Sequence, residues 1–126
     1  MKKNILIITL SIILAQSAYA VPAWEVPQDK ANMVNPVPVS EKSLMRGEGA
    51  YRQLCMTCHG ADGHGNKFSV SYWAGGMPDI KKSMEGQSDG ALYYKISEGR
   101  EAMPSFSKTL MPDDIWNIIN YLKNLK

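Results

Sequence analysis

The chain has 126 residues, which is enough for one domain and too few for two. Its 14 basic and 12 acidic side chains give a formal net charge of +2. No basic patch or block of like charge occurs along the sequence, which excludes the composition expected of a nucleic-acid-binding protein or a charged tail.

Residues 1–20 have the pattern of a secretory leader. Lys2 and Lys3 provide a positive start, and residues 5–15 form a short apolar segment. Ala18-Tyr19-Ala20 then provides a small-residue cleavage site. The apolar segment is shorter than the roughly 20 residues that span a membrane, and an uncleaved membrane anchor is the alternative interpretation. We expect cleavage after Ala20 and a periplasmic mature chain that is nearly neutral, because both leader lysines are lost.

The segment 21–39 is rich in proline, which predicts an N-terminal arm that is extended rather than helical. Its prolines are Pro22, Pro27, Pro36 and Pro38. Trp24 lies within this arm, where it either packs on the domain or belongs to a flexible spacer. We favour packing.

A helix is predicted to begin after Ser40, which is a good N-cap residue. The helix carries apolar and small residues at helical spacing and ends where the two cysteines begin. Gly47 lowers the helix propensity by about 1 kcal/mol relative to Ala. A glycine that weakens a helix often allows close approach of another backbone, so Gly47 is interpreted as the crossing point with another helix.

The most informative feature of the chain is Cys55-Met56-Thr57-Cys58-His59, which contains both of its cysteines. This spacing is typical of covalent haem attachment, in which two thiols add to the two vinyl groups of one haem and the histidine binds the iron. A redox-active dithiol would need a βαβ context, and a zinc site would need a second ligand pair. A disulfide would close a very small loop and stabilise little. We therefore expect one covalently bound haem c.

Loops and two further helices follow the motif. Residues 60–65 form a glycine-rich turn, and residues 68–87 form a long loop with a short helix near 80–84. A second main helix is predicted from its cap at Ser88 to the stop at Gly99. After a loop that contains Met103-Pro104, the last helix begins at Pro112. Its predicted apolar face consists of Ile115, Ile118, Ile119 and Leu122.

These elements together resemble the class I (His/Met) monohaem c-type cytochromes. The resemblance covers residues 40–126 and is close along 55–63, 88–106 and 114–123, whereas the arm 21–39 lies outside the shared pattern. It implies an all-α fold, a small cytochrome c-like helical domain with long loops wrapped around one haem.

The resemblance also implies roles for individual residues. Cys55 and Cys58 are expected to carry the thioethers, and His59 is expected to be the proximal iron ligand. Met103 matches the family's distal ligand, because its Met-Pro lies in the loop before the last helix. Pro78 matches the proline whose carbonyl accepts the proton of the other His59 ring nitrogen.

Several residues compete with Met103 for the distal position. Met77 is also followed by proline, but it precedes the helix at Ser88, whereas the family's ligand loop follows that helix. Met84 and Met111 are further candidates, although a methionine is more often core filler than a ligand. His64 lies only five residues beyond His59 and would have to reach the opposite face of the haem, so it is interpreted as a surface loop residue.

With both axial positions filled, the iron has no open site for a substrate. The sequence therefore predicts a periplasmic carrier of single electrons rather than an enzyme, with other redox proteins as donor and acceptor. Two alternatives stay open: a fixed electron-accepting subunit of a larger oxidoreductase, with the arm around Trp24 as its docking segment, and a haem enzyme or sensor with an open distal site. As a carrier the protein would be monomeric.

Overall fold

The computed structural model describes residues 23–66, 77 and 79–125. Within them the chain forms six helices: α1 (Gln28–Ala31), α2 (Glu41–Leu54), α3 (Met56–His59), α4 (Ile80–Met84), α5 (Asp89–Glu98) and α6 (Pro112–Asn124). The described residues contain no strand, only an isolated bridge between Arg100 and Met103. The prediction of an all-α fold is confirmed. The predicted leader and Pro78 lie outside the described residues.

The predicted helix ends are confirmed by their caps. Ser40 accepts a hydrogen bond from the Ser43 amide and begins α2, and Ser88 accepts one from the Ala91 amide and begins α5. α5 ends at Gly99, whose φ of +66° is in the left-handed region that favours glycine. Pro112 occupies the first turn of α6, where its missing amide hydrogen has no cost.

α2 and α6 cross at Gly47, as the sequence predicts. A Cβ atom on Gly47 would lie 2.0 Å from the Asn117 carbonyl oxygen and 2.8 Å from Cβ of Tyr121. The rings of Tyr51 and Tyr121 pack one turn further along, with their centroids 5.4 Å apart. The backbone partner of Gly47 is thus Asn117. The backbones of α2 and α6 can approach this closely only because residue 47 has no side chain.

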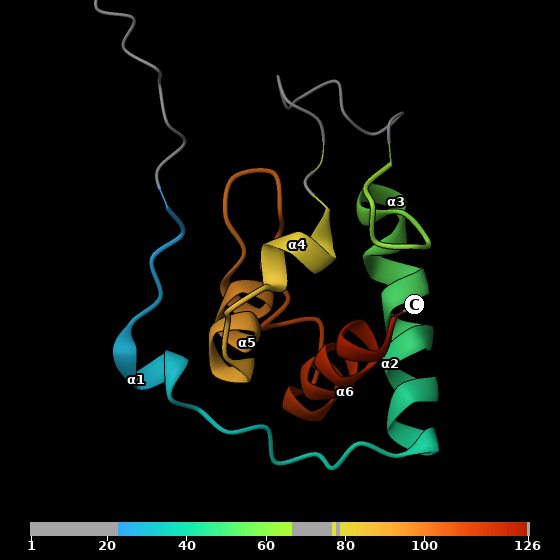
Figure 1. The fold of residues 1–126 in the computed structure, drawn as a ribbon, viewed down its shortest axis with the longest axis horizontal. Helices are drawn as coiled ribbons and strands as arrows, with labels where there is room; N and C mark the ends of the chain where they lie inside the picture. Colours follow the sequence, from blue (N-terminus) through green and yellow to red (C-terminus); the bar gives the residue numbers. More distant parts are fainter. Residues whose placement is uncertain (1–22, 67–76, 78, 126) are drawn as a thin grey trace, which may run out of the picture.

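α6 is buried on more than the predicted apolar face. The predicted face is confirmed, because Ile115, Ile118, Ile119 and Leu122 are all buried. Trp116, Asn117 and Asn120 are buried as well, because α2 and α5 pack on different sides of α6 and the arm passes near it (Figure 1). The core is therefore built around the last helix of the chain.

The N-terminal arm packs on the domain, and it is not entirely extended. The prediction that it contains no helix is wrong, because α1 forms directly after Pro27, with Asp29 in its first turn. Proline is well tolerated at a helix start, where its amide hydrogen would have no partner. α1 packs against α5 (Figure 1), where a Cβ on Gly90 would lie 2.2 Å from the Lys30 carbonyl oxygen.

A buried amide fixes the second half of the arm. The Asn120 side chain donates hydrogen bonds to the Val37 carbonyl at 3.0 Å and to the Ser43 hydroxyl at 2.9 Å. It also accepts one from the Asn35 side chain at 2.9 Å. One residue of α6 thereby joins the arm to α2.

Within the described ranges, no helix has the length and apolar character needed to cross a membrane.

Candidate functional site

The cysteine motif begins at the last turn of α2 and forms α3. Cys55 caps α2, and its carbonyl accepts hydrogen bonds from the amides of Cys58 at 3.2 Å and His59 at 2.9 Å. The buried hydroxyl of Tyr51 donates to the Gly60 carbonyl at 2.6 Å, directly after the histidine. Burial is the main cause that raises the pKa of Tyr51, so this hydroxyl keeps its proton. These contacts tie the motif to the helix crossing.

A largely apolar cavity of about 660 Å³, counted with its open mouth, lies beside the motif. Four of the sequence-predicted site residues lie on its walls: Cys55, Cys58, His59 and Met103. The other lining residues are Trp24, Leu54, Met77, Arg100, Ala102, Pro104 and Phe106. The fifth predicted residue, Pro78, lies outside the described residues.

His59 presents an unusual polar atom in this setting. Its Nδ1 is buried and has no hydrogen-bond partner among the described residues. Such a group costs roughly 1–3 kcal/mol when it is left unsatisfied, so buried orphans are rare in folded proteins. Burial also lowers the pKa of His59, which favours the neutral imidazole. A neutral imidazole is the form that binds metals.

The two thiols differ in their surroundings. Cys55 is half-buried and Cys58 is exposed, and neither is in a disulfide. Burial raises the pKa of the Cys55 thiol to about 11, and the neighbouring Cys58 adds to this shift. In the protein without a cofactor, Cys55 is therefore a neutral thiol near pH 7 rather than an activated nucleophile of the thioredoxin kind.

Met103 is held in the cavity wall by a tight turn after α5. Its amide and carbonyl both pair with the backbone of Arg100, at 3.0 and 2.9 Å. A Cβ on Gly99 would lie 2.4 Å from the Met103 carbonyl oxygen, and Gly99 has a positive φ. The turn therefore depends on glycine at this position. The backbone of Met103 is fixed from two sides.

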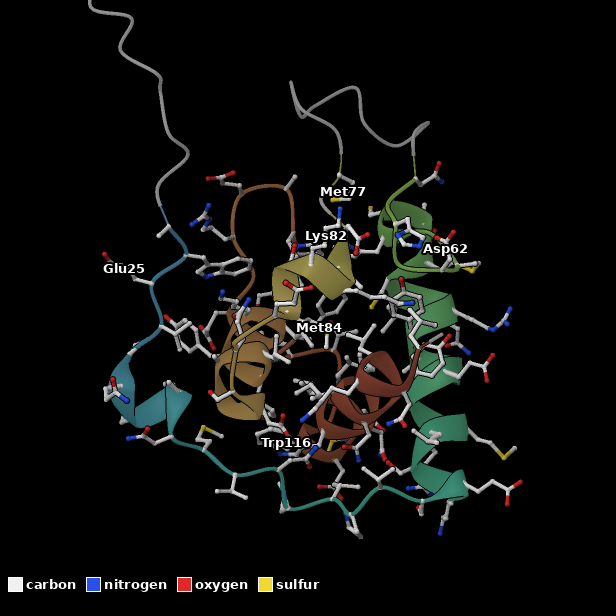
Figure 2. The ribbon with its side chains drawn as sticks, viewed as in Figure 1. Glu25, Asp62, Met77, Lys82, Met84 and Trp116 are labelled. Atoms are coloured by element: carbon white, nitrogen blue, oxygen red, sulfur yellow. The ribbon has the colours of Figure 1, made fainter. Side chains whose placement is uncertain are left out.

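Met77 also lines the cavity, so a place in the cavity wall does not by itself decide whether Met77 or Met103 is the distal ligand. Met77 lies close to the segment that follows His59. A Cβ on Gly65 would be 2.7 Å from the Met77 carbonyl oxygen, and the Gly65 amide donates to the His59 carbonyl at 2.8 Å. Figure 2 shows Met77 at the same end of the molecule as Asp62, which belongs to that segment. Met103 comes from a different wall, the turn after α5.

The other candidate ligands lie away from the cavity lining. His64 is mostly exposed, and its Nδ1 lies 2.6 Å from a carboxylate oxygen of Asp79. Met84 packs against the core, and Met111 is 70% exposed. Within the described residues, no cluster of three or more His, Cys, Asp or Glu side chains is arranged to hold a metal ion.

Sequence reasoning missed several walls of the cavity. Leu54 and Phe106 enclose it with apolar surface, and Arg100 brings a cation to it. The sequence predicts that Trp24 packs on the domain but does not predict that it lines the cavity. A large aromatic residue in a proline-rich arm was the available signal, although nothing in the local sequence specifies which surface it covers.

Comparison with known proteins identifies the kind of domain. The family model described as "Cytochrome C oxidase, cbb3-type, subunit III" matches residues 42–122. The chain belongs to this family of c-type cytochrome domains. The resemblance noted from the sequence is thereby confirmed. Electron transfer through covalently bound haem c is the chemistry of this class.

Individual relatives support the same family. The chain is 27% identical over 124 residues to cytochrome c-555 of Methylococcus capsulatus, a match that covers 97% of this chain and 85% of that protein. A chain of the reducing HAO-like protein complex of Kuenenia stuttgartiensis is similar in structure, with a TM-score of 0.62 and 26% identity. That match covers 85% of this chain but only 52% of the other chain.

A third relative is similar in fold alone. Cytochrome cL of Methylophaga aminisulfidivorans has a TM-score of 0.53 and 20% identity, with 68% of this chain and 55% of that chain covered. The chain thus spans about half the length of each of these two protein chains.

The residues of the cavity fit the haem c that the family implies. Two thiols at CxxCH spacing, a histidine with a buried ring nitrogen and a thioether lie around one apolar space. These are the donor types that bind haem covalently and ligate its iron. The expected cofactor is therefore in agreement with the site.

Proposed function

We propose that the protein is a periplasmic carrier of single electrons whose haem iron is bound by His59 and Met103. The supporting observation is that one cavity is lined by Cys55, Cys58, His59 and Met103 together. The two cysteines would hold the haem through thioethers. When bound, the group supplies a one-electron ferric–ferrous couple whose potential depends on ligand type and burial.

The chain's own contribution would be to hold two ligands in fixed positions. His59 is fixed at the end of α3, and Met103 is fixed by its backbone pairing with Arg100. With both ligands held, few atoms have to move when an electron arrives or leaves. A thioether ligand and apolar walls both disfavour the extra charge of the ferric state, so they raise the reduction potential.

Pro78 is proposed as the acceptor for the remaining proton of His59. What supports this is the buried Nδ1 of His59, which has no partner among the described residues. A backbone carbonyl at this place would fix the orientation of the imidazole and raise its basicity as a ligand. Met77, the neighbour of Pro78 in sequence, contributes to the lining of the same cavity.

Localisation and partners follow the same proposal. The leader-like residues 1–20 and cleavage after Ala20 would deliver the chain to the periplasm, where it would exchange electrons with a donor and an acceptor protein. Contacts between mobile electron carriers and their partners are small, typically below about 1,200 Å². The nearly neutral mature chain favours neither an acidic nor a basic partner.

A fixed subunit of a larger oxidoreductase is the second candidate. What favours it is the structural similarity to a chain of the reducing HAO-like protein complex, in which this fold occurs within a longer polypeptide. In that case the N-terminal arm or the exposed surface would dock permanently on a partner.

Two measurements on the native protein separate these possibilities. The haem-loaded protein is isolated gently from the periplasm, and its molecular mass and the binding of carbon monoxide to its ferrous form are measured. A monomer that binds carbon monoxide only slowly is expected for the carrier. Isolation in a stable complex would favour the subunit, and immediate carbon monoxide binding would contradict the His/Met assignment in favour of an enzyme or sensor.

A further inference from the structure

Trp24 brings the N-terminal arm to the haem cavity. Among the described lining residues, it alone comes from outside the segment 42–122 that the family model matches. Its indole lies against the turn that carries Met103, because the Arg100 guanidinium carbon is 5.2 Å from the centre of its ring. This wall of the cavity is therefore supplied by a part of the chain outside the segment that the family model matches.

On the C-terminal side of Trp24, the arm is fixed against the start of α5. It runs antiparallel to α5, since Trp24 lies near Lys95 and Arg100 whereas Ala31 lies near the start of the helix. There the Ser88 hydroxyl donates to the Ala31 carbonyl at 2.6 Å. Gly90 allows α1 to approach the backbone of α5. The arm thus follows the whole length of α5.

Two cations hold the indole in place. The Lys95 ammonium lies 5.5 Å from the ring centre and the Arg100 guanidinium carbon lies 5.2 Å from it, and Arg100 also lines the cavity. Both distances are within the range at which a cation is attracted to an aromatic face. Burial is the main cause that lowers the pKa of Lys95, and nearby Arg100 adds to the shift, so the ammonium beside the indole is partly shielded from water.

We propose that Trp24 is a positioning residue of the haem pocket, whose indole closes the Met103 side against water and thereby raises the reduction potential. This inference rests on the proposed function, because it assumes a haem bound between His59 and Met103. A dry wall disfavours the extra positive charge of ferric iron, whereas water next to the iron would stabilise it. The arm then serves as part of the electron-transfer site rather than as a linker.

The test compares three variants of the haem-loaded protein: Trp24→Ala, Trp24→Phe and Val34→Ala. Val34 is the matched control, since it lies in the same arm, is 84% exposed and carries no charge. Trp24→Ala should lower the equilibrium constant for reduction about tenfold, which is about 59 mV for a one-electron couple. It should also speed carbon monoxide binding to the ferrous form. Trp24→Phe should fall between Trp24→Ala and the parent, and Val34→Ala should match the parent.

Three results would overturn the inference. The first is a Trp24→Ala protein that has the reduction potential and carbon monoxide kinetics of the parent. The second is a Trp24→Ala protein that loses thermal stability but keeps the parent's potential, which would mean that Trp24 only contributes packing. If Trp24→Ala does not mature, Trp24→Phe decides, and a parental potential in that variant sinks the idea. A parent that lacks sulfur ligation while Trp24→Ala still shifts the potential would refute the Met103 assignment and leave the role of Trp24 intact.

Discussion

Tyr51 connects the helix crossing to the haem-attachment segment through a single hydroxyl group. Its ring packs on Tyr121, and its hydroxyl donates to the Gly60 carbonyl next to His59. The side chain is completely buried, which makes this hydrogen bond hard to replace with water. A residue deep in the α2–α6 contact therefore also fixes the end of α3.

Tyr51→Phe should lower the free energy of unfolding by about 1–2 kcal/mol, because the Gly60 carbonyl loses a buried donor. The pKa of Tyr51 is raised in the folded protein, so unfolding lets this tyrosine ionise once the pH exceeds about 10. The parent should lose stability in that range, and Tyr51→Phe should lose less. Denaturant unfolding of the haem-loaded protein at neutral and alkaline pH measures both effects.

Tyr121→Phe is the control for this prediction. The Tyr121 ring takes part in the same aromatic pair, whereas its hydroxyl makes no hydrogen bond that we find within the described residues. It should change the stability at neutral pH by less than Tyr51→Phe does. Equal losses in the two variants would mean that the Gly60 hydrogen bond contributes nothing specific.

At the scale of elements, the crossing of α2 and α6 depends on one glycine. Gly47→Ala would place a methyl group 2.0 Å from the Asn117 carbonyl oxygen, which forces the two helices apart. Overpacking of this kind typically costs about 1–3 kcal/mol. We expect a clear loss of thermal stability, measured by circular dichroism of the haem-loaded protein.

Gly49 offers a matched control in the same helix, two residues away. Among the described residues, no atom beyond the adjoining residues and backbone of α2 lies within 4 Å of a Cβ built at Gly49, so an added methyl group meets open space. Gly49→Ala should therefore stabilise the protein by up to about 1 kcal/mol through helix propensity alone. Opposite signs for the two substitutions are the expected result, and the same sign for both would show that the crossing is not tightly packed at Gly47.

At the scale of the whole molecule, most helix boundaries could be predicted because they depend on local chemistry. Ser40, Ser88 and Pro112 act through hydrogen bonds or dihedral angles within one turn of the chain, and all three lie where the sequence predicts. Gly47 could be predicted as a crossing point because glycine weakens a helix interior, and close approach of another backbone explains why it occurs there.

The missed features depend on contacts between distant parts of the chain. The position of Trp24 in the cavity wall depends on the packing of α1 on Gly90 and on the hydrogen bond from the Asn120 side chain to the arm. No local sequence pattern specifies either contact. The burial of Asn117 and Asn120 arises because α6 has neighbours on several sides. Likewise, the presence of both Met77 and Met103 at the cavity is a property of the assembled fold.

The central proposal is that His59 and Met103, which line the same cavity, would both bind the haem iron. The most direct test is the visible spectrum of the ferric protein in the parent, in Met103→Ala and in the matched variant Met77→Ala. The account predicts the weak far-red band of sulfur bound to iron in the parent and in Met77→Ala, and its loss in Met103→Ala. A band that persists in Met103→Ala but disappears in Met77→Ala would contradict the account and assign the iron to the other methionine.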